Sequence, residues 1–344
     1  MQATLKHHNP APSLRRRAMT TAALLLGSAS ATGLAWAQSA PTPPPTTYPT
    51  KAVTVVTAFA VGSGPDAVLR LVANKLSIAW KQSVTVDNRP GGGGFIAIEA
   101  ARRAAPDGHT LLQLDSEHLS ALPHLYKKRN FQTLQVFDPV APLFRTPFLV
   151  AVPTQSPWKN VGDLIAAAKK GPVSYGSWGV GSPGHLGGEW LDLVAGTQMT
   201  HVPFREVSQL FTSVANGDPS WSLASVPSSQ GIYKAGKIRY LAVAGPRRIS
   251  QMPDVPTLAE SGGPAQVDVN SFVSLLTPKG VPATVRAQIH ADVLKVLQEP
   301  EVREKFNAFA FEPLSWSAEE IQRQAGVKSE QYKVLIQKAN ISLD

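Results

Sequence analysis

Two short segments rich in glycine, serine and proline have the residue types best suited to hold a small anion. Residues 62–66 read Gly-Ser-Gly-Pro-Asp and lie between an apolar, β-rich run and a helical pattern. Residues 177–185 read Ser-Trp-Gly-Val-Gly-Ser-Pro-Gly-His in the same kind of position. Backbone N–H groups and the positive end of a helix dipole bind anions at such places. Two such loops facing one cleft would hold both ends of a dicarboxylate, or one carboxylate from two sides.

The first loop has three interpretations: a carboxylate cradle, a nucleotide-binding turn and a plain tight turn. A dinucleotide-binding turn needs a third glycine, whereas Gly62 and Gly64 are followed by Pro65, Asp66 and an alanine. We therefore favour the carboxylate cradle. Asp66 can contact the ligand, or it can simply stabilise the first helical turn through the helix dipole.

The second loop has similar alternatives, since it can also merely connect two elements. Ser177 and Ser182 can add hydroxyl donors. Trp178 is either a core residue or a flat platform for a ring. His185 either contacts the ligand or caps the following helix.

Other candidate chemistry is poorly supported. The glycine run 91–94 lacks the Lys-Ser/Thr of a phosphate-binding P-loop. Arg89 can be a counter-ion, but we favour a role in tying loops together. No pair of histidines has zinc spacing, and Gly-x-Ser-x-Gly is absent around Ser63 and Ser182. We expect no metal, no cofactor and no catalytic site.

The elements around the loops predict an α/β fold. Strands at 53–59, 84–87 and 109–114 alternate with helices that begin near Pro65 and span 95–105, which favours a parallel sheet. After an apolar strand at 148–152 the same order restarts, and a strand at 271–276 precedes a helical tail. We therefore predict a two-lobed, clamshell fold with two hinge-crossing strands. The expected parts are lobe 1 (48–145 plus 275–344) and lobe 2 (146–274).

The amino end predicts export. Three arginines (15–17) precede an apolar run (18–34) and Ala35-Trp36-Ala37, a pattern typical of a signal peptide cleaved after Ala37. A membrane anchor is the less favoured alternative, the choice between general and twin-arginine export stays open, and 38–47 is a proline-rich linker.

Composition excludes several classes of protein. The chain has 344 residues, of which 43% are hydrophobic and none is cysteine, which excludes global disorder, disulfides and thiolate metal sites. The net charge of +9 includes four basic and no acidic residues within 1–37, so the rest of the chain carries only +5. We therefore expect no nucleic-acid partner.

The sequence also resembles a known family, the Bug-type, TctC-like receptors of tripartite tricarboxylate transporters. The segments that carry the resemblance, in family order, are 48–49, 59–66, 87–91, 105–112, 123–126, 175–177, 181–186, 201–204, 235–239 and 253–257. The resemblance implies a type II periplasmic-binding-protein-like Venus-flytrap fold and delivery of a small carboxylate to separate membrane permease subunits. It also implies that backbone amides and bridging waters of 61–65 and 177–182 hold the carboxylate. We expect a monomer in the periplasm.

Departures from the family bear on specificity. The family's first loop commonly reads Phe-Ala-Pro-Gly-Gly-Ser-Thr-Asp, whereas Pro65 here removes one N–H donor. Ala224, beside Ser225, stands where the family often has an acid that meets an amino group. With Trp178 nearby, an aromatic carboxylate such as terephthalate is favoured over citrate or aspartate. The expected ligand-binding residues are Phe59, Val61, Gly62, Ser63, Gly64, Pro65, Asp66, Ser177, Trp178, Val180, Gly181, Ser182, His185, Phe204, Ala224 and Ser225.

Two other functions remain as alternatives. The same fold can act as a ligand sensor that docks on a membrane signalling protein. A secreted hydrolase is less favoured, because no nucleophile and base are assembled in the sequence.

Overall fold

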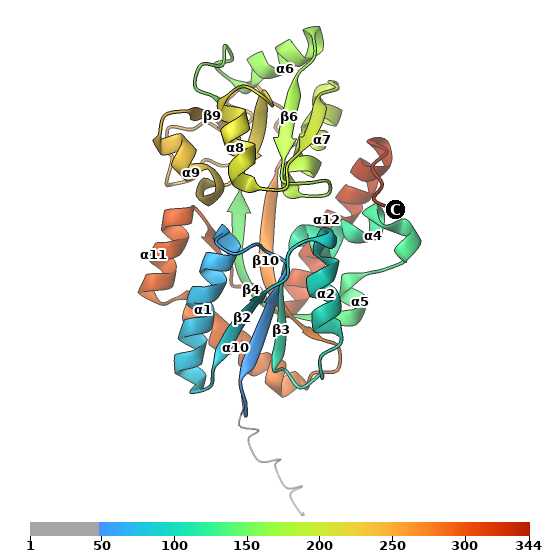
Figure 1. Cartoon of the computed structure of the whole chain (residues 1–344), viewed down its shortest axis with the longest axis vertical. Helices are drawn as coiled ribbons and strands as arrows, with labels where there is room; N and C mark the ends of the chain where they lie inside the picture. The colour runs from blue at the N-terminus through green and yellow to red at the C-terminus, as the bar shows by residue number, and fades with distance from the viewer. Residues whose placement is uncertain (1–47) are drawn as a thin grey trace, which may run out of the picture. The chain divides into compact units, whose positions relative to one another are not determined.

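The computed structural model describes residues 48–344, which belong to one compact unit. The predicted signal peptide and the proline-rich linker lie outside the described residues. Figure 1 shows two β-sheets, one above the other, each flanked by helices. No helix within residues 48–344 combines the length and the apolar character that a membrane crossing needs.

Two sheets define two lobes. We call lobe 1 the part built on the six-stranded sheet, with strand order β11-β4-β10-β3-β1-β2, and lobe 2 the part built on the five-stranded sheet, with order β7-β6-β8-β5-β9. The mixed α/β architecture confirms the predicted two-lobed fold class. The residue bounds proposed for the lobes from the sequence stay a prediction.

Lobe 1 contains the predicted parallel unit, because β1 pairs in parallel with both β2 and β3. Its strands are β1 (Val53–Thr57), β2 (Val84–Asn88), β3 (Thr110–Asp115), β4 (Phe137–Pro147), β10 (Asn270–Pro278) and β11 (Glu312–Pro313). Its helices are α1 (Gly64–Trp80), α2 (Phe95–Arg102), α3 (Ser116–Ser120), α4 (Leu122–Leu125), α5 (Thr133–Val136), α10 (Ala283–Leu297), α11 (Pro300–Phe309) and α12 (Ala318–Lys338). Short 3₁₀ turns span Gly92–Gly94 and Lys127–Arg129.

Strand β4 was not predicted from the sequence. Prolines 139, 142 and 147 interrupt its apolar pattern, and proline normally disfavours a central strand because it lacks an N–H donor. Here β4 pairs in antiparallel with β10 over its whole length, and the register shifts twice, between Val273 and Ser274 and between Leu275 and Leu276. These irregularities accommodate the prolines within the sheet.

Lobe 2 repeats the strand–helix order. Its strands are β5 (Leu149–Pro153), β6 (Ser174–Ser177), β7 (Thr200–Pro203), β8 (Trp221–Ala224) and β9 (Ile238–Val243), and its helices are α6 (Val161–Lys170), α7 (Pro183–Ala195), α8 (Val207–Ala215) and α9 (Val226–Lys234). Strand β6 is parallel to β7 and β8, whereas β5 is antiparallel to β8 and β9. The chain enters lobe 2 through the buried Phe148 and returns along 244–270.

Both candidate loops follow the carboxyl end of a strand that lies inside its sheet. The first connects β1 to α1, and the second connects β6 to α7. In open α/β sheets this edge is where ligands bind. The predicted strand at 53–59 was too long, because β1 ends at Thr57 and residues 58–63 form the loop.

Candidate functional site: two matched loops

The first loop is shaped by a reciprocal cap at the start of α1. The Ser63 hydroxyl oxygen accepts a hydrogen bond from the Asp66 backbone N–H at 3.4 Å, and Asp66 Oδ2 accepts one from the Gly62 N–H at 2.8 Å. Such an arrangement satisfies one N–H group of the first helical turn and one of the loop before the helix. Gly62 has φ of +81°, a left-handed conformation that favours glycine.

The Asp66 carboxylate is almost fully buried and fully engaged by the protein. Besides Gly62, it accepts hydrogen bonds from Asn88 Nδ2 at 2.7 Å and Arg70 Nε at 3.1 Å. Burial opposes its ionisation, but these three hydrogen bonds outweigh that cost and hold the pKa of Asp66 below its usual value. The geometry therefore gives Asp66 a structural role in holding the loop.

The second loop is a geometric copy of the first. The Ser182 hydroxyl oxygen accepts from the His185 N–H at 3.3 Å, and His185 Nδ1 accepts from the Gly181 N–H at 3.1 Å. The capping serines have nearly identical dihedrals, φ −68° and ψ 160° for Ser63 and φ −68° and ψ 159° for Ser182. Gly181 has φ of +83°, matching Gly62.

Matched positions also carry matched side chains. Val61 and Val180 precede the two left-handed glycines, and their side chains are 72% and 39% exposed. Each loop therefore presents one exposed valine directly before its left-handed glycine.

Several backbone amides of the two loops are free to donate. Within residues 48–344, the N–H groups of Val61 and Gly64 in the first loop have no hydrogen-bond acceptor, and neither have those of Val180 and Gly184 in the second. Proline occupies the second helical position in α1 but the first in α7. The two helix ends therefore offer donors at different positions, Gly64 in one and Gly184 in the other.

A stacked histidine pair lies beneath the second loop. The rings of His185 and His201 are 4.0 Å apart between centroids, and His201 Nε2 shares a hydrogen bond of 2.6 Å with the Ser177 hydroxyl. Burial, aided by His201, lowers the pKa of His185 to about 3, and burial lowers that of His201 to about 4. Both rings are therefore neutral at pH 7, and His185 Nδ1 is available as the acceptor for Gly181.

Trp178 is partly buried and covers the start of α7. A Cβ atom on Gly184 would lie 3.0 Å from its ring, and its centroid is 5.7 Å from that of Phe148 at the hinge. Phe204 packs on the same apolar cluster of lobe 2, where Ala224 is fully buried. The Ser225 hydroxyl donates to Ser228 Oγ at 2.9 Å at the start of α9. Phe59 packs against the core of lobe 1.

Asn88 is a loop-holding residue that the sequence analysis did not single out. Its side-chain amide bonds both Asp66 and the Phe59 carbonyl oxygen, the latter at 3.0 Å. Arg89, which we expected to tie loops together, pairs instead with its neighbour Asp87 at 2.8 Å. The Asn-Arg-Pro-Gly turn therefore helps to hold the first loop through Asn88, and the role predicted for Arg89 is wrong.

The described residues contain no obvious catalytic constellation at the two loops. Ser63 and Ser182 serve as helix caps. Ser177 contacts a histidine, yet it is fully buried and its hydroxyl also bonds the backbone of Gly179. Between residues 48 and 344, no three histidine, aspartate or glutamate side chains gather closely enough to hold a metal ion.

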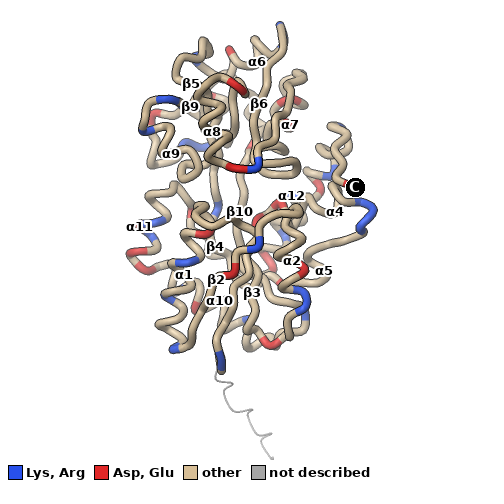
Figure 2. The backbone as a smooth tube through the Cα atoms, in the orientation of Figure 1, with Lys and Arg blue, Asp and Glu red and all other residues tan. Residues whose placement is uncertain are grey.

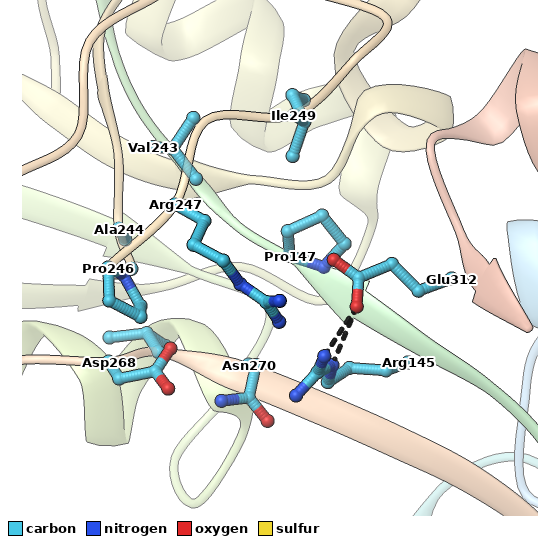
Figure 3. A pocket seen from close by; sticks show the side chains of 12 residues that line it. Arg145, Pro147, Val243, Ala244, Pro246, Arg247, Ile249, Asp268, Asn270 and Glu312 are labelled. Atoms are coloured by element: carbon cyan, nitrogen blue, oxygen red, sulfur yellow. Dashed lines mark hydrogen bonds and ion pairs between the residues drawn. The ribbon is translucent and has the colours of Figure 1, made fainter. Parts of the chain in front are cut away.

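A separate crevice crosses the hinge. Figure 3 shows the Arg145–Glu312 ion pair of lobe 1 on one side and Arg247 of lobe 2 extending toward it, above Asn270. None of the crevice-lining residues belongs to the two loops. Arg145 Nε and Nη2 both donate to Glu312 Oε2, whereas the Arg247 guanidinium makes no hydrogen bond or ion pair with another residue of 48–344. The crevice therefore has a charged donor of its own, apart from the amides of the two loops. Figure 2 shows acidic and basic residues interspersed over both lobes.

Comparison with known proteins identifies the family. The model of the tripartite tricarboxylate transporter family receptor matches residues 68–341, which include the second loop and begin just after the first. The chain belongs to this receptor family.

Curated relatives of the receptor agree with this assignment. A protein encoded in the tcbD–tcbE intergenic region of Pseudomonas sp. strain P51 is 32% identical over 259 residues, which cover 75% of this chain and 77% of the relative. Protein BugT of Bordetella pertussis is 28% identical over 299 residues, covering 83% of this chain and 90% of BugT.

Solved structures resemble the receptor along nearly their whole length. A periplasmic transporter is 31% identical with a TM-score of 0.78, and the match covers 86% of this chain and 100% of that one. Rpa4515 of R. palustris, solved with adipate, is 28% identical with a TM-score of 0.79 and the same coverage. The periplasmic binding protein BugD is 25% identical with a TM-score of 0.75, covering 86% of this chain and 99% of BugD.

Proposed function

We propose that this protein captures a small organic carboxylate in the periplasm, between the loop before α1 and the loop before α7, and delivers it to the membrane permease subunits of a tripartite tricarboxylate transporter. The observation that carries the proposal is the matched pair of helix amino ends with unpaired amides. The relationship to Rpa4515, solved with adipate, supports the same ligand class. Export through a signal peptide cleaved after Ala37 belongs to this proposal, as does a role without catalysis.

The electrostatics of the loops suit an anion that must be released again. Neither 60–65 nor 177–185 contains lysine or arginine, and the histidines beneath the second loop are neutral. Attraction would come from amide dipoles and the partial charge at each helix end, contributions that are modest and short-ranged. Release of a carboxylate from such a site would not require separating it from a fully charged lysine or arginine.

We further propose that the ligand is an aromatic carboxylate such as terephthalate. The Trp178 ring lies over the start of α7, directly beside the Gly184 amide that is free to donate. A ligand whose carboxylate reached that amide would place its carbon skeleton near the ring, where aromatic stacking is favourable. Buried Ala224 offers no charge to meet an amino group, which disfavours amino acids.

The candidate ligand-binding residues are still those expected from the sequence, and we divide them into two roles. Direct contact would come from the Val61 and Gly64 amides, from the Val180 and Gly184 amides, and from Trp178. Asp66, His185, Ser63 and Ser182 would act by holding these amides in place. Gly184 is an addition to the residues expected from the sequence.

A ligand screen tests the proposal. Terephthalate, benzoate, adipate, citrate and aspartate would each be added to the mature protein, and the melting temperature and calorimetric affinity measured. A ligand at a hundred times its Kd stabilises the folded state by about 2.7 kcal/mol, so a true ligand gives a clear shift. If no carboxylate shifts the melting temperature, the proposed function is wrong.

A tryptophan variant tests the aromatic preference. Trp178→Ala should weaken terephthalate binding more than adipate binding, because only the aromatic ring can stack on the side chain. Trp190→Ala is a matched control, because Trp190 lies on α7 and is likewise partly buried. If adipate binds more tightly than terephthalate to the unaltered protein, the ligand is aliphatic and the role proposed for Trp178 is refuted.

A further inference from the structure

Each of the two loops is touched at a glycine by an apolar side chain of the opposite lobe. A Cβ atom on Gly64, in the first loop of lobe 1, would lie 2.8 Å from Cγ of Pro227 at the start of α9 in lobe 2. A Cβ atom on Gly181, in the second loop of lobe 2, would lie 2.7 Å from Cδ1 of Leu125 in α4 of lobe 1. Real Cβ atoms essentially never approach neighbours within 3.0 Å, so a side chain at either glycine would force a neighbour to shift. At Gly64 the Phe311 ring of lobe 1, 3.0 Å from such a Cβ atom, is a second close neighbour.

The two contacts are reciprocal. Lobe 2 reaches the lobe 1 loop through Pro227, and lobe 1 reaches the lobe 2 loop through Leu125. Both contacts fall within the segments that carry the unpaired amides. The shape of each amide cradle therefore depends on the position of the other lobe.

Leu125 also belongs to an apolar cluster that spans both lobes. The cluster joins Leu186 of α7 in lobe 2 to the lobe 1 side chains Ala121, Leu125, Tyr332, Leu335 and Ile336, all of them buried. Leu125 itself is 2% exposed, and its carbonyl oxygen accepts a hydrogen bond from the Leu343 N–H at 2.9 Å. Moving the lobes apart would expose this apolar surface to water, at a cost that grows with the exposed area.

We propose that Leu125 and Pro227 are positioning residues that couple closure of the lobes to the shape of the two ligand loops. Neither residue needs to touch the ligand. Each fills the space left by a glycine in the opposite loop, so that both amide cradles reach their binding geometry only when the lobes meet. This inference rests on the proposed function, because it concerns how those loops are held for the ligand.

The coupling has a consequence for affinity. When only part of the population is in the binding-competent form, the apparent Kd rises in inverse proportion to that fraction. A side chain that keeps the lobes apart and lowers the closed population tenfold would therefore raise the apparent Kd about tenfold. The loops themselves would keep their sequence and their caps.

The distance between the lobes can be measured directly, because the chain has no cysteine of its own. Spin labels on Ile78→Cys in α1 and Lys234→Cys in α9, both at exposed positions, report the interlobe distance by double electron–electron resonance. We expect Gly64→Ala to lengthen the mean distance in the protein without added ligand. Gly64 does not have a positive φ, so the alanine acts through the steric contact and not through backbone strain.

A double variant separates the cross-lobe contact from any local effect. Gly64→Ala with Pro227→Ala should bring the distance back toward the unaltered value, because the Pro227 Cγ atom, the nearest neighbour of the new methyl group, is then absent. Gly64→Ala with Pro300→Ala should not. Pro300 is a matched control, since it also lies in the first turn of a helix but is exposed on lobe 1. Equal distances in the Gly64→Ala and unaltered proteins, or no recovery in the double variant, would overturn the role of Pro227.

A second pair of variants tests Leu125. Leu125→Ala should shift the distance distribution toward longer values, whereas Leu122→Ala should not, because Leu122 packs in the core cluster of lobe 1. Indistinguishable distributions for the two variants would overturn the role of Leu125. These distance measurements need no ligand. A negative result would overturn the coupling between the lobes, whereas a failure of carboxylates to bind would count against the proposed function alone.

Discussion

The loops before α1 and α7 have the same backbone geometry but different chemistry beneath it. In both, a serine caps the helix, and the side chain three residues later accepts a hydrogen bond from a left-handed glycine. In the first loop that acceptor is a buried carboxylate compensated by Arg70, and in the second it is a neutral histidine stacked on His201. The geometry of the cradle thus depends on the presence of an acceptor at this position and not on its charge.

The order of glycine and proline provides a second difference. Gly64-Pro65 leaves the first amide of α1 free, whereas Pro183-Gly184 leaves the second amide of α7 free. The two ends of a ligand would therefore meet donors in different places.

The largest expected effect tests whether Asp66 anchors the first loop or only stabilises the start of α1. Asp66→Ala should lower the free energy of unfolding by about 3 kcal/mol, because it removes a buried carboxylate and leaves Asn88 and the Gly62 amide without their acceptor. Urea denaturation of the variant and the unaltered protein measures the difference.

Asp163→Ala is the matched control for this variant. Asp163 occupies the same position in α6, where the Asn160 side chain caps the helix and the Lys159 N–H donates to the carboxylate at 2.8 Å. Because Asp163 is more exposed, its loss should cost about 1 kcal/mol or less. Equal costs for the two variants would mean that Asp66 only stabilises its helix and does not anchor the loop.

The fold was largely predictable because its signals are local. Runs rich in β-branched residues, such as 53–57 and 84–86, are strand-like by composition, and the glycine and proline that follow them mark the breaks before the next helices. Strand β4 was missed because its prolines argue against a strand, and its stability depends on pairing with β10, more than a hundred residues away in sequence. Only tertiary structure could reveal that pairing.

The site was predictable as two loops but not in its details. The sequence repeat Gly-Ser followed by proline predicted two similar loops, and their capping serines do have matched dihedrals. That they bind an anion stays a prediction. The sequence could not show that Asn88 and not Arg89 reaches Asp66, since the two residues are adjacent and both have polar side chains. The stacking of His201 on His185 was also not predictable from the sequence. It depends on the parallel pairing of β6 with β7, which places His201 next to Tyr175.

A further effect should appear when the pH is lowered, and the stacked histidines of the second loop should contribute to it. The pKa values of His185 and His201 in the folded state, about 3 and about 4, lie below the ordinary value of 6.5. Between pH 6.5 and 4 these two histidines bind more protons in the unfolded chain than in the folded one, so their contribution to stability falls as the pH falls. Asp66 has a lowered pKa, so its contribution is lost only below its ordinary value of 3.8.

A variant isolates this contribution from the other titrating groups. Burial raises the pKa of nearby Glu189, which stabilises the folded state as the pH falls and offsets part of the loss. His201→Gln should therefore be compared with the unaltered protein at pH 7 and pH 4.5, by urea denaturation. The variant should lose less stability over this interval. His290→Gln is the control for removing a histidine outside the second loop, since His290 is bonded to the Val140 carbonyl. Parallel losses in all three proteins would contradict the assignment to the histidine pair.

The smallest effect compares the two capping serines. Ser63→Ala should cost about 1 kcal/mol, the usual value for a lost helix cap. Ser182→Ala should cost about 1 kcal/mol more, because the Ser182 hydroxyl also donates to the Gly179 carbonyl oxygen at 2.7 Å, a bond within the loop itself. Urea denaturation of both variants gives the difference, and Ser317→Ala, which removes a cap at the exposed start of α12, supplies the reference for a cap without a loop bond. If Ser182→Ala costs no more than the other two, the second loop keeps its shape without that bond, and the stacked histidines beneath it would have to hold the cradle alone.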